Sequence, residues 1–340
     1  MFVFLGSLAT AIAAFAIGAV VSLGTSWLLV SRLERVGERL GLSEALLGLM
    51  AALAADSPEI TAAVTALVHR QESVGVGVVV GSNVFNLAAL LGLGALVAGR
   101  VHLHRKVVLL SGVVAVWVAV VCLVSVLGII DPVAGLVLVL VVMIPYVVAL
   151  TSHRTWLRRL PLPPRLTGAI LSAVDEEALD LVSAEPPRRG TGRDGLVAAA
   201  ALVVVVAASA FMEGGASSLG RHFGIAQEVV GGLILAAVTS MPNAVAAVHL
   251  ASRERGAAVL STALNSNALN VTAGLLVPAI FLGLARPSGA GVLVVCSYVG
   301  LTLVTLAMAY SDHGIGRSAG LLVIFLYAAF VASLLVVVSV

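Results

Sequence analysis

Two carboxylates lie inside one of the long apolar stretches of this 340-residue chain. Asp56 and Glu59 are three positions apart, so on an α-helix their side chains would share a face. A charged group at the centre of a membrane costs about 2.5–3.5 kcal/mol on insertion scales, and a second like charge beside it adds repulsion. No Lys or Arg lies deep within an apolar stretch to compensate them. The pair therefore predicts a bound metal cation, a bound proton or a water-filled cavity.

The polar pattern around these carboxylates occurs a second time, and one constant offset of 184 positions relates the two copies. The first copy contains Asp56-Ser57-Pro58-Glu59 and Gly81-Ser82-Asn83-Val84-Phe85-Asn86, and the second contains Ser240-Met241-Pro242-Asn243 and Asn265-Ser266-Asn267-Ala268-Leu269-Asn270. Matching polar segments interrupted by proline, one in each half of a membrane protein, are the best sequence indication of a central binding site in a transporter.

The polar side chains of both copies offer oxygen, with no cluster of sulfur or imidazole groups beside them. Sites made of oxygen alone suit hard cations such as Ca²⁺, Na⁺ or Mg²⁺ rather than Zn²⁺ or Cu⁺. Singly, such residues in membrane helices usually join helices to one another, but the set in repeat register favours a cation site. The candidate metal ligands are Glu59, Asp56, Ser82, Asn86, Thr239, Ser240, Asn243, Ser266 and Asn270.

The repeated prolines predict a further source of ligands. Pro58 and Pro242 each remove a backbone donor and clash with the preceding helical turn. Carbonyl groups near residues 54–55 and 238–239 are therefore expected to be released toward a cavity, where they could contribute to the site.

The elements that must position these residues are membrane-spanning helices. The chain is 60% hydrophobic and only 11% charged, with a mean hydropathy of +1.14, which excludes an ordinary soluble domain. The apolar runs are too long and continuous for the strands of a membrane barrel. We predict an all-α integral membrane protein with ten transmembrane helices at about 2–30, 43–68, 73–98, 107–129, 132–151, 195–219, 226–250, 257–283, 288–310 and 317–340.

The distribution of basic residues predicts the orientation in the membrane. Sixteen of the 19 Lys and Arg residues fall in the odd-numbered connections between these helices. Basic residues favour the cytoplasmic side, so the odd connections are expected in the cytoplasm and both termini outside.

A polar segment divides the predicted helices five and five. Residues 152–194 contain five prolines and an acidic run, and we interpret them as a cytoplasmic linker rather than a regulatory cation site. The predicted domains are a first five-helix repeat at 1–151, with its motif at about 43–98, and a second at 195–340, with its motif at about 226–283. Because five is odd, the two repeats would be inverted, an arrangement that supports alternating access to a site at the midplane.

The two motifs resemble the α-repeats of the cation/Ca²⁺ exchanger superfamily. Pro58-Glu59 with Gly81-Ser82-Asn83-Val84-Phe85-Asn86 is similar to the first repeat, and Thr239-Ser240-Met241-Pro242 with Asn265-Ser266-Asn267 is similar to the second. The resemblance implies that the ions lie between the second, third, seventh and eighth helices. It also implies ligand roles for Glu59, for Ser82 and Asn86, for Thr239 and Ser240, and for Ser266 and Asn270.

The sequence departs from that family at three places. Asn243 stands where the second repeat usually has glutamate, and Asn270 where Asp is frequent. Ala55-Asp56 replaces the usual Thr-Ser, so one expected carboxylate is missing and another has appeared nearby. With Asp56 and Glu59 both ionised the site has a formal charge near −2, which balances one divalent ion, two monovalent ions or two protons.

The resemblance and the residues together predict a secondary antiporter, not an enzyme, that exchanges Ca²⁺ for Na⁺ or H⁺ by alternating access. A passive cation channel, an antiporter with altered cation selectivity and a member that binds ions without transporting them are the alternatives. A membrane enzyme using the Asp56–Glu59 pair is disfavoured because the motif occurs in both halves.

The expected partners are inorganic cations and the lipid bilayer, with no nucleic acid, no cofactor and a monomeric chain. Transported Ca²⁺ and Na⁺ or H⁺ would be the ligands. The expected location is the plasma (inner) membrane of a prokaryotic cell.

Overall fold

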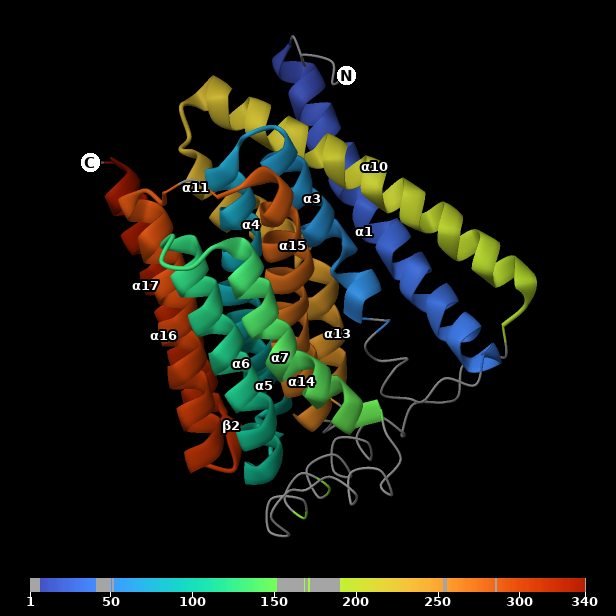
Figure 1. Ribbon diagram of the computed structural model, residues 1–340, viewed down its shortest axis with the longest axis vertical. Helices are drawn as coiled ribbons and strands as arrows, with labels where there is room; N and C mark the ends of the chain where they lie inside the picture. The colour runs from blue at the N-terminus through green and yellow to red at the C-terminus, as the bar shows by residue number, and fades with distance from the viewer. Residues whose placement is uncertain are drawn as a thin grey trace.

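Long apolar helices make up nearly all of the structure, a computed structural model that describes residues 7–40, 50, 52–151, 168, 171, 190–252, 256–284 and 286–339 (Figure 1). Val, Leu and Ala dominate these segments. A helix satisfies its backbone hydrogen bonds without water, which the interior of a membrane requires.

The first part of the chain contains α1 (Leu8–Arg39), α3 (Ser57–Val68), α4 (Glu72–Asn86), η1 (Leu87–Leu93), α5 (Gly94–Ala98), α6 (Arg105–Val126) and α7 (Pro132–Thr151). The second part contains α10 (Gly192–Phe223), α11 (Gln227–Val229), η2 (Val230–Leu235), α12 (Ala236–Thr239), α13 (Met241–Ser252), α14 (Gly256–Leu269), η3 (Asn270–Leu276), α15 (Val277–Leu282), α16 (Gly289–Ser311) and α17 (Arg317–Ser339). The elements labelled η are π-helical segments within longer helices.

Eight helices among the described residues are long and apolar enough to cross a membrane, and a ninth candidate is the bent pair Gln227–Thr239 and Met241–Ser252. The apolar helix α3 has 12 residues and is shorter than a full span. Residues 41–49, which precede it, lie outside the described part of the chain, so the predicted total of ten stays a prediction. The described helices are those of a multi-pass membrane protein, as expected.

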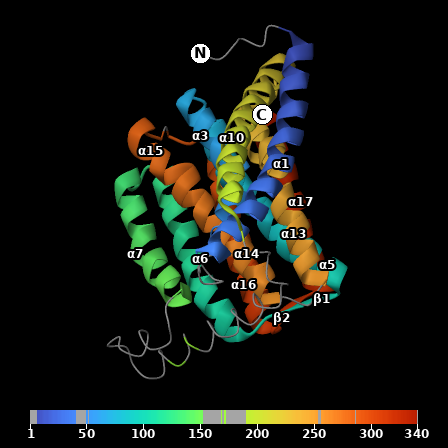
Figure 2. The same cartoon turned by 90° about the vertical axis from the view of Figure 1, so that its right-hand side faces the viewer.

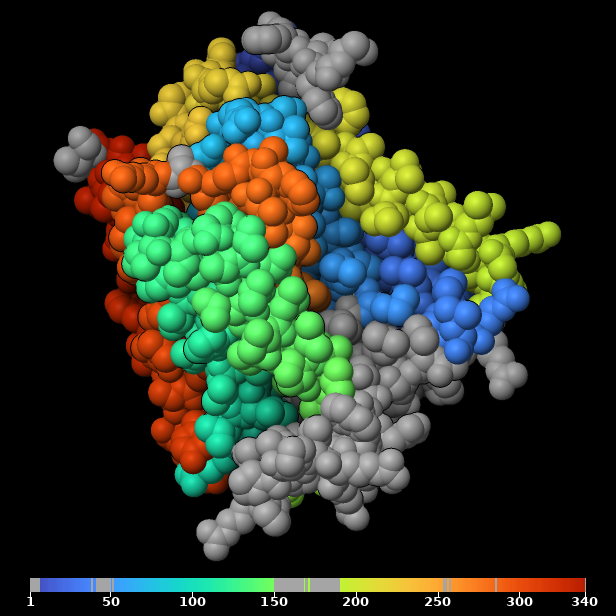
Figure 3. Space-filling view, in the orientation of Figure 1, coloured from blue at the N-terminus to red at the C-terminus, as the bar shows by residue number. Residues whose placement is uncertain are grey.

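The helices α1 and α10 form a long pair at one side of the molecule (Figure 1). Gly18 and Gly215 bring their backbones together, because a side chain at either glycine would overlap the backbone of the opposite helix. The hydroxyl groups of Ser22 and Ser209 are 2.6 Å apart across this contact. In the space-filling view, the surface of α3 lies between those of α15 and α10 (Figure 3).

The centre of the molecule is built from α3, α4, α13 and α14, and each of these helices is irregular near the repeated motifs. A turn at Asp56 precedes α3, and Ser240 separates α12 from α13 with a bend of 46°. The segment η1 begins directly after Asn86, and η3 begins at Asn270. Positions 56 and 240, and positions 86 and 270, correspond in the two sequence copies, so the same irregularities occur twice.

The connections between helices gather at the two ends of the molecule. Strands β1 (Arg100–His102) and β2 (Gly314–Gly316) form a short antiparallel ribbon, with Val101 opposite Ile315, at the end away from the N-terminal end of α1 (Figure 2). The basic ends of α1, α6 and α17 lie at this end as well. This arrangement agrees with the predicted grouping of basic residues. Most of the predicted linker 152–194, including its acidic run, lies outside the described residues.

Candidate functional site

Both carboxylates lie at the N-terminus of α3. Asp56 is the residue that precedes the helix, Pro58 stands in its first turn and Glu59 follows. The first turn of a helix has unpaired N–H groups and a positive dipole end, which favour negative charge. Proline fits there without losing a hydrogen bond. The sequence Asp56-Ser57-Pro58-Glu59 therefore begins a helix and places two acids at the same point.

Asp56 joins side chains of the other repeat. Its Oδ1 atom accepts hydrogen bonds from Asn243 Nδ2 at 2.7 Å and from Ser266 Oγ at 2.6 Å. Asn86 Nδ2 reaches Ser266 Oγ at 3.2 Å, which brings α4 into the same network. These four residues are at most 2% exposed. Residues 180 to 210 positions apart in the sequence thus form one buried polar cluster.

A second group of contacts joins α4 and α14 symmetrically. Asn83 Nδ2 donates to the backbone carbonyl of Asn267 at 3.1 Å, and Asn267 Nδ2 donates to the carbonyl of Asn83 at 3.2 Å. Asn270 Nδ2 also lies 3.3 Å from Asn83 Oδ1. Because Asn83 and Asn267 are equivalent in the two copies, the reciprocal bonds are those that inverted repeats would form. The bounds of the two repeats stay a prediction.

Several buried oxygen atoms of the cluster have no hydrogen-bond partner among the described residues. A buried polar group without a partner costs about 1–3 kcal/mol, so native structures have few of them and each needs an explanation. A bound cation would give these atoms a partner. The atoms are Asp56 Oδ2, both Glu59 carboxylate oxygens, Ser82 Oγ, Asn86 Oδ1, Ser240 Oγ and Asn270 Oδ1.

The charge of the cluster is not balanced by protein groups. Asp56 and Glu59 are 0% exposed and close enough to repel each other. Within the described ranges, no Lys, Arg or His forms an ion pair with either of them. The same residues contain no group of three His, Cys, Asp or Glu side chains that could hold a metal ion. A hard cation held by two carboxylates and neutral oxygens fits this set.

The remaining predicted ligands lie close by but contribute differently. Ser240 lies beside the Glu59 carboxyl group. Thr239 donates its hydroxyl proton to the Leu235 carbonyl of its own helix at 2.9 Å, so its oxygen can act only as an acceptor toward a ligand. Ser82 is buried in α4 with no hydrogen bond to the network. All nine predicted residues are buried in the four central helical segments and their breaks.

The release of backbone carbonyls near residues 54–55 and 238–239 stays a prediction, although the Ala54 carbonyl already has donors of its own. The carbonyl that Pro58 leaves without a helical donor belongs to Ala54. It accepts instead from Ser57 Oγ at 2.6 Å and from Ser26 Oγ of α1 at 3.1 Å. In the second copy, the Val238 carbonyl accepts a backbone N–H at the end of α12. The Ala54 carbonyl thus has two hydroxyl donors, so the side-chain oxygens are the stronger ligand candidates there.

Sequence reasoning missed the role of two residues in the site and the burial of a third residue outside it. Asn83 and Asn267 were recognised as repeat identities but were given no role, although their constant offset already marked them as equivalent. Glu213 lies outside the site, toward the end of the predicted helix 195–219. The helix α10 continues to Phe223, and Glu213 is 0% exposed within it.

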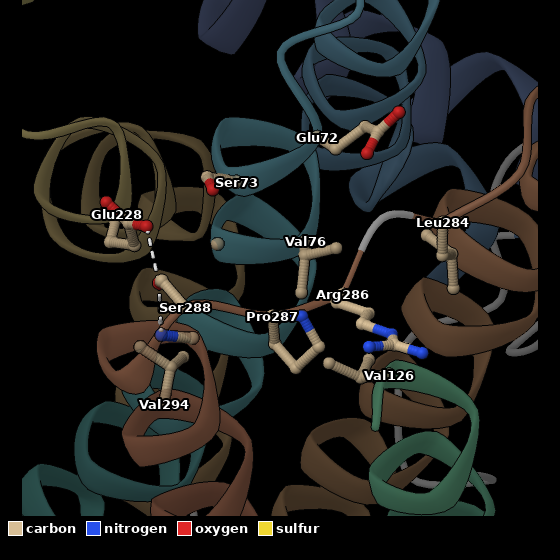
Figure 4. Close-up of a pocket in the computed structure, with 12 residues that line it drawn as sticks. Glu72, Ser73, Val76, Val126, Glu228, Leu284, Arg286, Pro287, Ser288 and Val294 are labelled. Carbon is tan, nitrogen blue, oxygen red and sulfur yellow. Dashed lines mark hydrogen bonds between the residues drawn. The ribbon is translucent and has the colours of Figure 1, made fainter. Parts of the chain in front are cut away.

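A separate pocket lies where the ends of several helices meet (Figure 4). Glu72 of α4, Glu228 of α11 and Arg286 line it, and Glu228 accepts a hydrogen bond from Ser288 at 2.7 Å. The pocket shares no residue with the candidate cation site and combines both charge signs.

The two halves of the chain match one known family. The profile described as sodium/calcium exchanger protein covers residues 10–153 and 195–336, which is more than half of the sequence. The chain belongs to the sodium/calcium exchanger protein family. The predicted resemblance is thereby confirmed. Members of this family are transporters, so the membrane-enzyme alternative no longer stands.

Relatives of this exchanger-family chain are distant. A candidate antiporter of Alkalimonas amylolytica, CaxA, is 31% identical over 83 residues, which is 24% of this chain and 26% of the length of that relative. The H⁺/Ca²⁺ exchanger CAX has a similar structure, with a TM-score of 0.68 and 15% identity, over 97% of this chain and 84% of the other. The sodium-calcium exchanger NCX_Mj matches with a TM-score of 0.61 and 20% identity, over 96% of this chain and 99% of the other. At these identities the two structures show a shared fold.

Proposed function

We propose that this protein exchanges Ca²⁺ for H⁺ across a membrane, with the two ions binding in turn at the buried site around Asp56 and Glu59. The observation that carries the proposal is the set of buried oxygens without protein partners, which includes both Glu59 oxygens and one Asp56 oxygen. Oxygen ligands of this kind are those that Ca²⁺ prefers. Glu59, Asp56, Ser82, Asn86, Ser240 and Asn270 would supply unpaired oxygens, and Thr239, Asn243 and Ser266 would line or support the site.

The charge of the site supports a proton as the counter-ion. Two carboxylates balance one divalent cation, and two protons restore the same neutrality when the cation leaves. Without either, two like charges would remain in a site with 0% exposure, which is costly. Coupling to Na⁺ is the second candidate, since the neutral amide and hydroxyl oxygens of the cluster also suit that ion.

The arrangement of the central helices supports alternating access. The helices α3 and α13 run in opposite directions, as do α4 and α14 (Figure 1). Each repeat contributes residues to one cluster, and the reciprocal Asn83–Asn267 bonds lie between them. In transporters with inverted repeats, one part of the protein moves against another around such a central site.

Purified protein in proteoliposomes tests the proposal. A pH gradient should drive ⁴⁵Ca²⁺ uptake, and Glu59→Gln should abolish it. Loss of one partner of a buried charge interaction costs about 2–5 kcal/mol, so the rate should fall by at least roughly 30-fold. The control is Glu228→Gln, the same chemical change at a partly exposed residue outside the cluster, which should keep the wild-type rate.

The ion gradients distinguish the alternatives. Uptake driven by a Na⁺ gradient and not by a pH gradient would replace H⁺ by Na⁺ as the counter-ion. Ca²⁺ flux that needs no counter-ion on the opposite side would indicate a channel. Replacing Ca²⁺ by Mg²⁺ or Mn²⁺ measures the selectivity. Full gradient-driven uptake by Glu59→Gln would contradict the proposed site.

A further inference from the structure

A second buried carboxyl group lies away from the cation site. Glu213 is in the middle part of α10 and is 0% exposed. Its Oε1 atom lies 2.7 Å from Ser217 Oγ, one helical turn further on. Its Oε2 atom has no hydrogen-bond partner among the described residues, and His69 Nδ1, at the end of α3, is 3.6 Å away. That separation is too long for a good hydrogen bond.

The Ser217 hydroxyl makes two short contacts at once. Its Oγ atom is 2.6 Å from Gln71 Oε1, in the turn between α3 and α4, and 2.7 Å from Glu213 Oε1. A hydroxyl group has one proton, and ionised carboxylate and amide oxygens only accept. With Glu213 ionised, one of the two contacts would join two oxygens with no proton between them.

One added proton gives every contact a donor. A neutral Glu213 donates its O–H to Ser217 Oγ, and Ser217 then donates to Gln71 Oε1. The neutral form also removes a buried negative charge whose nearby cations are the partly exposed His69, at 3.6 Å, and the exposed Arg221. A buried charge costs far more than a neutral polar group unless it is well paired.

The charged groups near Glu213 are few. His69 and Arg70 directly follow α3, Glu72 begins α4, and Arg221 lies two turns further along α10. The Arg221 side chain is exposed and donates to Ser218 Oγ at 3.0 Å. The part of α1 that packs here, around Ala11 and Phe15, has no charged residue, since the first one in the chain is Arg32. The segment η2 also has none.

We propose that Glu213 carries a proton in the folded protein and forms, with Ser217, Gln71 and His69, a proton-binding site distinct from the cation site. The His69 side chain is 30% exposed, so it links the buried carboxyl group to the surface. When the proton leaves, Gln71 Oε1 loses its donor and the hydrogen-bonded contact between α10 and the α3–α4 turn is broken. The bound proton therefore stabilises the attachment of the α1–α10 pair to the central helices.

Infrared spectroscopy of the purified protein tests the proton directly, without transport. A protonated carboxyl group has a C=O stretching band that shifts in deuterated water. Glu213→Gln should lose one such component at neutral pH, whereas Glu228→Gln should keep the wild-type spectrum. If Asp56 and Glu59 bind Ca²⁺, saturating Ca²⁺ removes their protonated C=O bands from the spectrum. If they do not, their bands are the same in both proteins, and subtracting the variant spectrum from the wild-type spectrum leaves the band of Glu213.

A second variant covers the case in which Glu213→Gln does not fold. Ser217→Ala removes the acceptor of the Glu213 proton, so the same component should move to higher frequency and remain visible. A spectrum that neither variant changes would overturn the proposal and indicate an ionised Glu213 with the Gln71 amide group turned toward Ser217.

Transport gives an independent readout. Glutamine resembles the neutral acid at every pH. When the solution on the side of the α3–α4 turn is made alkaline, the transport rate of the wild type should fall, whereas Glu213→Gln should keep exchanging ions. Identical alkaline profiles for the two proteins would contradict the role of this proton in attaching α10.

Discussion

Asn243 and Asp56 show how a carboxylate can change its place in the sequence and keep its place in the site. From the resemblance to the exchanger superfamily, an acidic residue is expected at position 243, where this chain has Asn. The structure puts the amide nitrogen of Asn243 2.7 Å from Asp56 Oδ1. The carboxylate at position 56 is therefore close to where an acid at position 243 would be, but it comes from the opposite repeat.

This proximity predicts that the charge can be moved back. Asp56→Ser should weaken Ca²⁺ binding strongly, and adding Asn243→Asp should restore much of it, because Asp is nearly the same size as Asn and returns the lost charge. Calorimetric Ca²⁺ titration of the purified variants measures this. The control is Asn265→Asp in the Asp56→Ser background, since Asn265 bonds Ser261 outside the cluster. If both double variants bind Ca²⁺ equally weakly, an acid at position 243 does not replace the carboxylate of Asp56.

At the residue scale, the sequence revealed the participants but not their contacts. Asp56, Glu59 and the repeated asparagines could be found because polar residues are conspicuous in apolar helices and the offset pairs them. The bond from Ser266 to Asp56 spans 210 positions and depends on how the helices pack. The burial of Glu213 against the α3–α4 turn could not be predicted, because local composition does not show which helix ends pack together.

At the scale of helices, the contact between α4 and η2 depends on glycine. A methyl group at Gly81 would overlap the backbone of Gly232, and one at Gly77 would lie 2.8 Å from Gly232 N. Small residues let membrane helices approach this closely.

Gly81→Ala should therefore lower the melting temperature in detergent, since overpacking costs about 1–3 kcal/mol. The matched control is Gly300→Ala in α16, where an added methyl group meets no atom within 4 Å. That change should be neutral or slightly stabilising, because Ala favours the helix by about 1 kcal/mol over Gly. Equal melting temperatures for the two variants would show that η2 can move away at little cost.

Most helix positions were predictable within a few residues, whereas their internal irregularities were not. The first helix is the exception: it was predicted at 2–30 but runs Leu8–Arg39, so Arg32, Arg35 and Arg39 lie in its last turns and not in a connection. Apolar length alone located α6, α7 and α16. The π-helical segments after Asn86 and at Asn270 left no pattern in the sequence, although such segments are frequent at functional sites. Pro58 correctly indicated an interruption, but the hydroxyl of Ser26, on another helix, determined where the Ala54 carbonyl bonds.

At the scale of the whole molecule, the basic residues predict its orientation. The turn between α6 and α7 should face outward and the turn between α16 and β2 should face the cytoplasm. In a Cys296→Ser background, with Cys122 buried, a membrane-impermeant maleimide should label Ile129→Cys in intact cells. It should label Ser311→Cys only after permeabilisation. The reverse pattern would place both termini in the cytoplasm.

The sequence predicted the family and the membrane class of this molecule, because composition and two motifs in register are sufficient for both. The association of α1 with α10 could not be predicted, since it depends on Gly18 and Gly215 each packing against the backbone of a helix more than half of the chain away. The five-plus-five division stays a prediction, as much of residues 152–194 lies outside the described part of the structure.

The reciprocal bonds of Asn83 and Asn267 have a consequence for any cycle in which the two halves trade conformations. Each asparagine gives its amide to the other's carbonyl, so interchanging the halves turns the pair into itself. In such a cycle the same two hydrogen bonds would be present before and after the halves trade conformations. The two halves of the protein could then expose the site to water first on one side and later on the other without breaking the Asn83–Asn267 contact between them.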